Sequence, residues 1–345
     1  MGKEQVKTQS ASQPREPGLV LEPTYGYGDP FPRRPTLKEI AVEWVDAVAF
    51  WQDRSRLPAA LYVAYHIATF GAFIGFFAAF FSIGSVLVVL GIASLIGTVY
   101  NTVWYHRYCT HRAFEFRSIW LARVFLWTNP VCFREEGYVI PHRIHHSRTD
   151  EAADPYGPHL GWLGSYLATE SQQKLNRQIS RTEYDRLAKS LEHIGFPLGS
   201  YEQFQRLGSV EPIWHWLARM AMANLLWAWL GFAVAGWRGV LTWLAGVFLY
   251  SFLVRDFNYR GHGGYLGGHV PGLPLNQVFY GVIAGEWHEN HHAYPRSAKA
   301  GLAWWQIDIP FLLIKGLCLC GAVARYNLPP APGTEPAKIS QAESA

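Results

Sequence analysis

Long apolar stretches alternate with polar ones along this chain of 345 residues, and four of the apolar stretches approach or exceed the length of a membrane-spanning helix. They cover residues 58–80, 82–105, 212–237 and 240–257. A bilayer core of about 30 Å is crossed by about 20 helical residues. Because only short turns join the first stretch to the second and the third to the fourth, the pattern predicts an all-α integral membrane protein with four transmembrane helices in two hairpins.

Two weaker apolar segments, residues 118–133 and 303–323, carry charged side chains within them. Arg123 interrupts the first segment, and Asp308 and Lys315 interrupt the second. We expect both segments to form interfacial helices that pack beneath the membrane rather than cross it.

The two ends of the chain differ in composition from its centre. Residues 1–36 and 327–345 are rich in Pro, Gly and charged or small polar residues, so we expect them to be disordered or draped over the surface. The membrane domain would then cover residues 37–326. Basic residues flank the predicted spans on one side, whereas Arg238 is the single basic residue in the two turns on the other side. The positive-inside rule therefore predicts a multi-pass protein whose two termini and long middle loop face the cytosol.

Composition supports a protein that has the lipid bilayer as a partner. Half of the residues are apolar and 16% are charged, which suits a membrane protein with polar regions better than a soluble enzyme. The formal net charge of +4 is too small to indicate a nucleic-acid partner. No cysteine pair has the C-x-x-C spacing, so we expect buried, reduced thiols at Cys109, Cys132, Cys318 and Cys320.

Nine histidines gather in four short segments, WYHRYCTHRAF, PHRIHH, NYRGH and WHENHH. The nine are His106, His111, His142, His145, His146, His262, His288, His291 and His292. On a helix, positions i, i+3 and i+4 share one face, so each H-x-x-H-H segment offers three ring nitrogens together. Imidazole binds iron, zinc, copper and nickel readily, and a structural zinc site is complete with four ligands. The pattern therefore favours a site with two metal ions.

The predicted topology brings all four segments to one side of the membrane, where the metal site would face the cytosol. The second span ends at His106 and the fourth ends just before His262. His106 and His111 are five residues apart, so on a regular α-helix of about 3.6 residues per turn they diverge by about 140°. We expect these two to serve different metals or to straddle the pair. Asn258 lies one helical turn before His262 and is a candidate ligand or holder of a metal-bound water.

Carboxylates are expected around the metal ligands, because neutral imidazoles leave the charge of two metal ions uncompensated. The first candidates are Asp150, Asp154 and Asp256, each within one or two helical turns of a histidine segment. Further candidates are Glu135, Glu136, Glu286 and Glu289. A separate histidine, His66, lies inside the first span, where an ionisable group is a candidate functional residue.

The segments HRYCTHRAF, HRIHHSRTDEAADPYG, NYRGHGG and WHENHHAYP resemble the histidine boxes of membrane-bound fatty-acid desaturases, in particular the stearoyl-CoA and acyl-lipid Δ9 group. The resemblance covers roughly residues 58–310. It implies that the nine histidines bind two non-haem iron ions and that Asn258 contacts a metal-bound water. It further implies that O2 and two electrons are used to introduce a cis double bond into a saturated acyl chain. The electrons would come from an external donor such as ferredoxin, rubredoxin or cytochrome b5 with its reductase.

This reaction requires a narrow apolar tunnel for the acyl chain. Aromatic residues near the histidine boxes are candidates to line it: Tyr105, Tyr138, Trp162, Phe257, Tyr259 and Trp287. Basic residues that would hold the phosphates of coenzyme A are scarce after Trp162, so the substrate is open between an acyl-CoA, an acyl-lipid and a carrier-bound acyl chain. Two alternatives remain at the level of the sequence. One is a di-iron hydroxylase of alkyl or acyl chains on the same scaffold, and the other is a membrane metal transporter.

Overall fold

The computed structural model describes residues 18–28, 32–264 and 275–330, and most of these residues lie in helices. In chain order the elements are α1 (Leu37–Val48), η1 (Arg54–Arg56), α2 (Leu57–Phe80), α3 (Ile83–Ile96), η2 (Gly97–Thr110), β1 (Phe114–Phe116), α4 (Ile119–Thr128), α5 (Glu135–Ser147), η3 (Pro158–Leu160), α6 (Gly161–Ser171), α7 (Arg181–Leu191), η4 (Glu192–Ile194), α8 (Tyr201–Leu207), α9 (Ile213–Gly261), α10 (Val278–Ala284), α11 (His288–Ala293), α12 (Ile309–Leu319) and β2 (Val323–Tyr326).

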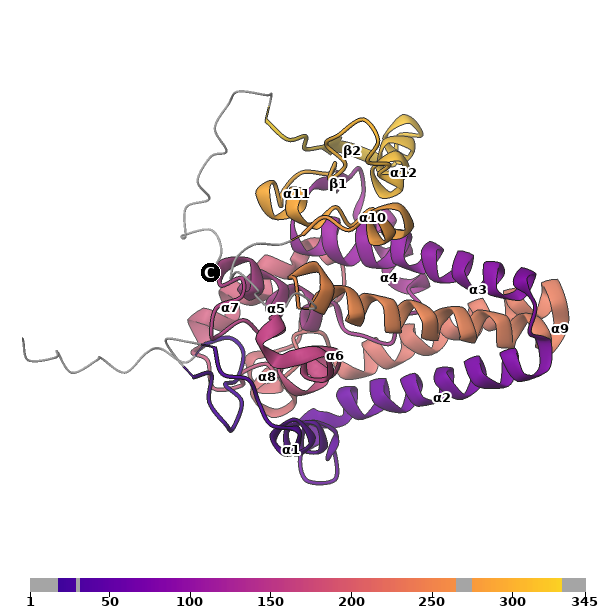
Figure 1. Ribbon diagram of the computed structural model, residues 1–345. Coiled ribbons are helices and arrows are strands. Elements are labelled where there is room, and N and C mark those ends of the chain that lie inside the picture. The colour runs from indigo at the N-terminus through magenta and orange to yellow at the C-terminus, as the bar shows by residue number, and fades with distance from the viewer. Residues whose placement is uncertain (1–17, 29–31, 265–274, 331–345) are drawn as a thin grey trace, which may run out of the picture.

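Within the part of the chain that the structure describes, three helical stretches are long and apolar enough to cross a membrane: Arg54–Phe80, Ile83–Thr110 and Ile213–Gly261. The helices α2, α3 and α9 pack side by side and extend together from one side of the molecule (Figure 1). Their outward faces carry large apolar side chains, and Ile83, Val234 and Leu225 are 80%, 87% and 70% exposed. An apolar surface of this extent is typical of a membrane or protein interface.

The longest of these stretches, α9, is two helical arms rather than one straight helix. Ala235 and Gly236 have non-helical backbone angles, with φ of 58° at Gly236, a conformation that a residue without a side chain adopts most easily. The rings of Trp227 and Trp243 stack with centroids 4.5 Å apart. In a continuous helix, 16 residues would separate them by about 24 Å. The chain therefore reverses near Gly236, and the two arms lie against each other.

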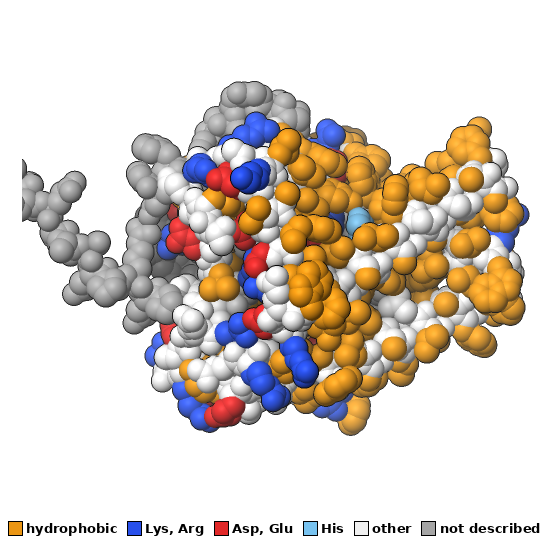
Figure 2. Space-filling model, turned by 90° about the horizontal axis from the view of Figure 1, so that it is seen from below, with side chains coloured by type: hydrophobic (Ala, Val, Ile, Leu, Met, Phe, Trp, Pro, Cys, Tyr) orange, Lys and Arg blue, Asp and Glu red, His pale blue; other side chains and the backbone are white. Residues whose placement is uncertain are grey.

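Most of the charged side chains gather at the opposite end of the molecule from this bundle (Figure 2). The predicted interfacial segments form α4 and α12, helices of 10 and 11 residues that are too short to cross a bilayer. Both leave apolar residues exposed, including Trp120 at 68% and Leu312 at 58%. Trp304, just before α12, is 96% exposed. Tryptophan side chains with such exposure are typical of the boundary between a membrane and water.

Two details depart from the expected all-α fold. β1 and β2 form a small antiparallel sheet, which the ion pair between Glu115 and Arg325 supports with a nitrogen–oxygen distance of 2.5 Å. Part of the N-terminal segment predicted to be disordered or draped over the surface is held there by backbone contacts, since Val20 forms a β-bridge with Leu175. The remainder of the disorder prediction, residues 1–17, 29–31 and 331–345, lies outside the described residues.

The segment η2 continues α3 with a different hydrogen-bond pattern. It is π-helical over Gly97–Thr110, so its backbone N–H groups bond to carbonyls five residues earlier instead of four. All residues from Gly97 to Thr110 except Val99 are buried. Pi-helical turns are rare and occur frequently at functional sites. This segment leads the chain from the apolar bundle into the polar end, where the histidines meet.

Candidate metal centre

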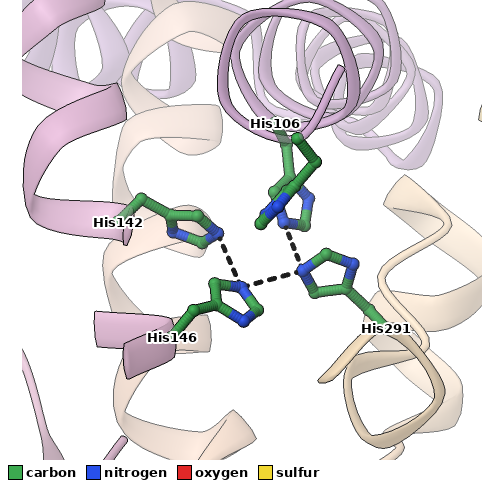
Figure 3. A group of neighbouring side chains, drawn as sticks. His106, His142, His146 and His291 are labelled. Atoms are coloured by element: carbon green, nitrogen blue, oxygen red, sulfur yellow. Dashed lines mark hydrogen bonds between the residues drawn. The ribbon is translucent and has the colours of Figure 1, made fainter. Parts of the chain in front are cut away.

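The nine histidines of the four segments form two groups in the polar end of the molecule. The first group consists of His106, His111, His142, His146 and His291, and the second consists of His145, His262, His288 and His292. Within each group, one ligand atom per residue lies within 4.8 Å of those of the other members. The side chains come from η2, α5, α11 and the end of α9, so segments far apart in the sequence converge here (Figure 3).

Each H-x-x-H-H segment contributes to both groups. On α5, His142 and His146 face the first group and His145 faces the second. On α11 the division is reversed. His291 joins the first group, and the other two histidines, His288 and His292, join the second. Residues i and i+4 are nearest neighbours on a helix surface, whereas a residue one position away points in a different direction. The two short helices therefore lie between the groups and serve both.

The structure corrects the expectation that His106 and His111 diverge. Both belong to the first group, and their ring centroids lie 5.0 Å apart. The amide of His111 donates to the carbonyl of His106 at 3.2 Å, which is an i→i+5 bond. The pi-helical turn places residues five apart one above the other. The expected divergence assumed a regular α-helix.

Four histidines of the first group direct their Nε2 atoms toward one another (Figure 3). The Nε2–Nε2 distances are 2.8 Å for His106 and His291, 3.0 Å for His291 and His146, and 3.1 Å for His146 and His142. Two imidazole nitrogens at about 2.1 Å from a metal and at right angles around it would be about 3.0 Å apart. The spacing therefore fits ligands that share one metal ion.

Three further Nε2 atoms are buried and lack a hydrogen-bond partner among the described residues. They belong to His111 of the first group and to His145 and His292 of the second. In the second group, the Nε2 atoms of His262 and His288 lie 2.7 Å apart. A buried nitrogen without a partner is costly, and a metal ion in each group would satisfy these atoms.

The Nδ1 atoms of four histidines face acceptors on the outside of the groups. Asp154 lies 2.8 Å from His145, and Asp150 lies 3.1 Å from His262. Two contacts involve residues that were not first candidates: Glu286 lies 3.4 Å from Nδ1 of His106, and the hydroxyl of Tyr156 lies 2.5 Å from Nδ1 of His142. Such partners fix the orientation of a metal-ligating imidazole ring and increase its basicity.

The third carboxylate candidate, Asp256, lies elsewhere. It is on α9 and accepts hydrogen bonds from Trp162 at 2.9 Å, Tyr280 at 2.6 Å and Arg260 at 2.6 Å. Its side chain therefore points toward α6 and α10 rather than toward a histidine group. Sequence proximity to the third box was misleading, because residues within two turns of a ligand can face the other side of the same helix.

Burial favours the neutral form of several of these imidazoles. It lowers the pKa of His142, His146 and His291 well below the ordinary value, and the neighbouring histidines lower it further. His288 and His292 are affected in the same way. The neutral form is the one that binds a metal ion. Asp154 behaves differently: burial by itself would raise its pKa, but the contact with His145 outweighs this and lowers it.

Three cavities with shared lining residues pass beside the first group. The middle cavity, of about 60 Å³, is lined by His142 and Asn258 and by two predicted tunnel residues, Tyr105 and Tyr138. It shares Tyr62, Phe133, Thr169 and Gln173 with an outer cavity of about 260 Å³. It shares Asn101, Tyr250 and Val254 with an inner cavity of about 30 Å³. The three cavities therefore lie in series, from the polar surface to the apolar bundle, and the middle one reaches His142.

A comparison with protein families agrees with this arrangement, because the model of the family described as fatty acid desaturase matches residues 83–318. The chain belongs to the fatty acid desaturase family. It is therefore an oxidoreductase that acts on acyl lipids or acyl-CoA. This assignment favours an enzyme over the alternative of a metal transporter.

The desaturase is similar to relatives that act at different positions on different acyl carriers. It is 26% identical to the sn-1 stearoyl-lipid 9-desaturase of Synechocystis over 75% of this chain and 77% of the relative. It is 28% identical to an acyl-CoA 5-desaturase of Anemone leveillei over 72% and 74% of the two chains. It is 27% identical to the chloroplastic palmitoyl-monogalactosyldiacylglycerol delta-7 desaturase of Arabidopsis thaliana over 86% and 76%.

Three of the six predicted tunnel residues line the cavities of the desaturase. Phe257 lines the inner cavity, beside the two tyrosines of the middle one. The other three lie elsewhere. Trp162 is 39% exposed, Trp287 is buried with its indole N–H donating to the carbonyl of Ile307 at 2.9 Å, and the ring of Tyr259 lies against Gly264.

Two groups of side chains outside the histidine boxes have structural explanations. His66 in α2 contacts the hydroxyls of Tyr166 at 2.9 Å and Ser251 at 3.2 Å, so it joins α2 to α6 and α9 as a satisfied polar group. The expectation of buried thiols holds for Cys109 and Cys132 but not for Cys320, which is exposed. The position of Cys320 just after α12, whose outward face is apolar, accounts for that exposure.

Proposed function

We propose that this protein is an O2-dependent acyl desaturase that introduces a cis double bond into a saturated chain, with the Δ9 position as the first expectation. The observation that carries the proposal is the cavity beside the first histidine group. It places a narrow, largely enclosed space against His142 and Asn258 and continues in both directions. An extended acyl chain that enters this space would have one short stretch of its length beside the histidines.

The two histidine groups are proposed to hold two non-haem iron ions, five ligands for one and four for the other, with Asn258 contacting a metal-bound water. Iron would supply the oxygen chemistry that breaks an unactivated C–H bond, which no amino-acid side chain can do. The protein residues orient and hold the ligands. Asp150, Asp154 and Glu286 accept from the outer ring nitrogens and offset the positive charge.

Substrate position is proposed to follow from the length of the route. The outer cavity has polar and charged walls and would receive the head group, whereas the inner cavity is lined largely by apolar side chains such as Ala93, Leu253 and Ile283. The methyl end of the chain would lie in that inner cavity. The relatives named above act at positions 5, 7 and 9, so the depth available to each end decides which carbon pair lies beside the histidines.

Four membrane crossings are proposed, with α2, α3 and the two arms of α9 as the spans. The reversal at Gly236 supports a turn on the far side of the bilayer from the histidines. Arg238 beside this turn is a lone basic residue, whereas many arginines occupy the opposite end. The positive-inside rule then supports both termini and the active site in the cytosol.

The test is the product formed in a host that expresses the chain and lacks the corresponding activity. A desaturase product has lost two hydrogens, whereas a hydroxylase product has gained one oxygen, and mass spectrometry of the released fatty acids separates the two. His291→Ala should abolish the product. Glu289→Gln is the matched control, because Glu289 is an exposed residue of the same short helix and belongs to neither histidine group. Hydroxylated product alone, or unchanged product with His291→Ala, would overturn the proposal.

A further inference from the structure

The proposed reaction needs electrons that its two substrates do not supply. Its balance is R–CH2–CH2–R′ + O2 + 2 e⁻ + 2 H⁺ → R–CH=CH–R′ + 2 H2O. Reduction of O2 to two waters takes four electrons, and the acyl chain provides two of them with its two hydrogens. A separate electron carrier must therefore deliver the other two electrons at a surface close to the histidine groups. This inference rests on the proposed function and adds the place and chemistry of that delivery.

A shallow basic groove lies next to the first histidine group. It has a volume of about 630 Å³ and is lined by Arg112, Arg186, Lys189, Ser190, Glu192 and His193. Three of these residues are cationic and one is anionic. Arg186 and Lys189 lie one helical turn apart on the exposed face of α7, so both charges point toward solvent.

The charges of this groove are less compensated than those at the mouth of the substrate route. At that mouth, Lys174 pairs with Asp46 at 2.8 Å and Arg177 pairs with Asp53 at 2.6 Å. Arg112 instead donates to neutral acceptors, the carbonyl of Ser190 and Nδ1 of His193, both at 3.0 Å. Two carboxylates lie near enough to act on these cations electrostatically, Glu115 on Arg112 and Glu183 on Arg186, but Glu115 pairs with Arg325 and Glu183 caps the start of α7. The groove therefore presents net positive charge to an incoming partner.

Hydrogen bonds join the floor of the groove to two segments that carry histidines of the first group. Nε2 of His193 lies 3.0 Å from the carbonyl oxygen of Cys109, and His111 of the first group follows two residues later. On the other side, Arg143 of α5 donates to the hydroxyl of Ser190 at 3.0 Å, which joins α7 to the helix carrying His142. One hydrogen bond and the chain from Cys109 to His111 therefore connect the groove to a candidate metal ligand.

The backbone at Arg112 supports a dedicated role for this loop. Its φ of 48° lies in the left-handed region, which is unfavourable for a residue with a long side chain. Hydrogen bonds from its amide to the carbonyl of Tyr108 and from Asn327 to its carbonyl, at 3.2 Å and 3.3 Å, hold this conformation. Backbone strain of this kind is concentrated at functional sites.

We propose that the groove formed by Arg112, Arg186, Lys189 and His193 is the docking site of an acidic one-electron carrier protein. The carrier binds by charge complementarity and delivers one electron in each of two encounters. The route to the first histidine group passes through His193 and the Cys109–His111 segment. The substrate mouth shares no lining residue with this groove, so carrier and acyl substrate can bind at the same time.

The test compares two electron sources with the purified, iron-loaded enzyme in lipid nanodiscs. One source is an acidic carrier, a plant-type ferredoxin or a soluble cytochrome b5 domain, each with its reductase. The other is a small reduced viologen, which needs no docking surface. The variant Arg186→Glu with Lys189→Glu reverses two charges of the groove. The matched control, Arg181→Glu with Arg206→Glu, makes the same change in net charge at exposed positions of α7 and α8 outside the groove.

The groove variant should raise KM for the acidic carrier by at least about tenfold, because rim charges act mainly on the association rate. Its turnover with the viologen should equal that of the wild type, and the control should match the wild type with both sources. Added salt should slow the wild type with the carrier and leave the groove variant nearly unaffected. If the groove variant loses activity equally with the carrier and with the viologen, or if it does not differ from the control variant, the proposed docking site is overturned. A wild type that turns over with viologen but with neither carrier would also overturn it. No product from any source would instead count against the proposed function.

Discussion

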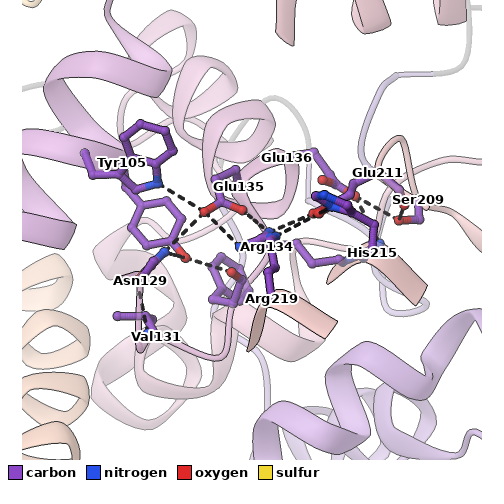
Figure 4. A network of polar contacts seen from close by, with 12 residues as sticks. Tyr105, Asn129, Val131, Arg134, Glu135, Glu136, Ser209, Glu211, His215 and Arg219 are labelled. Atoms are coloured by element: carbon purple, nitrogen blue, oxygen red, sulfur yellow. Dashed lines mark hydrogen bonds and ion pairs between the residues drawn. The ribbon is translucent and has the colours of Figure 1, made fainter. Parts of the chain in front are cut away.

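Replacement of Arg219 by Met should destabilise the protein strongly, because Arg219 holds two buried carboxylates. It lies in the first arm of α9, 2% exposed, and its side chain pairs with Glu135 and Glu211, both completely buried (Figure 4). Nε and Nη2 of Arg219 each lie 2.7 Å from an oxygen of Glu211. Glu135 also accepts from Trp104 at 3.1 Å and Asn129 at 3.2 Å.

The size of the effect follows from what remains after the guanidinium is removed. Breaking a buried ion pair by deleting one partner costs about 3–5 kcal/mol. For a large domain this corresponds to a fall in the unfolding midpoint of the order of 6–10 °C. Glu135 is the first residue of α5, the helix that carries His142, His145 and His146. Loss of this anchor should therefore lower bound iron as well as stability.

Thermal unfolding in nanodiscs, followed by tryptophan fluorescence, measures the first effect, and iron content per chain measures the second. The triple variant Arg219→Met, Glu135→Gln, Glu211→Gln is the control, because it removes the carboxylates together with the cation. It should recover most of the lost stability, since replacing a whole buried ionic group can be nearly neutral. If Arg219→Met shifts the midpoint by less than about 2 °C, or if the triple variant is as unstable as the single one, the reasoning is refuted.

The stability of the Arg219→Met variant should also depend on pH differently from that of the wild type. In the wild type, burial would raise the pKa of Glu211, but Arg219 outweighs this and lowers it. This carboxylate therefore contributes stability at neutral pH, and the contribution is lost as pH falls below its ordinary value. Without Arg219, only the contact with His215 opposes burial, so the pKa of Glu211 rises and the variant takes up a proton at a higher pH than the wild type. The stability difference between wild type and Arg219→Met should then shrink as the pH is lowered from 7 to 5.

Three other predictions concern the histidine groups and the substrate route. Tyr156→Phe removes the hydroxyl next to Nδ1 of His142, so activity or iron affinity should fall by about 10- to 100-fold, which titration with ferrous iron would measure. Gly97→Leu should shorten the preferred acyl chain, because a side chain there would extend between Ala284 and Tyr250 at the inner cavity without a backbone clash; fatty-acid profiling of the host would measure this. Dialysis with a chelator should remove iron at similar rates at pH 7.5 and pH 6.5, because burial holds the pKa of His142, His146 and His291 well below the ordinary value and few protons compete for these imidazoles; iron analysis of the dialysed protein would measure it.

The sequence alone predicted the long helices well, because continuous apolar length is a strong signal. The expected stretch 58–80 matches α2 (Leu57–Phe80) almost to the residue. The break expected between 237 and 240 appears two to four residues earlier, at Ala235 and Gly236. Both the length of the first stretch and the break near Gly236 follow from the local sequence rather than from contacts with distant segments. The nine histidines were also found from the sequence, since their spacing within each box is local.

Contacts between distant segments were not predictable in the same way. Glu135 and Arg219 are 84 residues apart, and nothing in either neighbourhood indicates the other. Tyr156 lies only two residues after Asp154, so its hydroxyl could have been considered, but a tyrosine near a box is more often a packing residue. Asp256 shows the opposite error, because it is near a ligand in sequence and points away from it in space.

The division of the histidines between the two groups depends on the conformation of η2. An α-helix through His106 and His111 would send their rings in different directions, and the first group would lose one member. The π-helical turn brings both rings into the group that already contains the two residues of α5 one helical turn apart. It does so with a backbone in which N–H groups reach one residue farther back, as the His111 to His106 bond shows. The number of histidines in the first group is thus set by backbone geometry that residue spacing alone does not reveal.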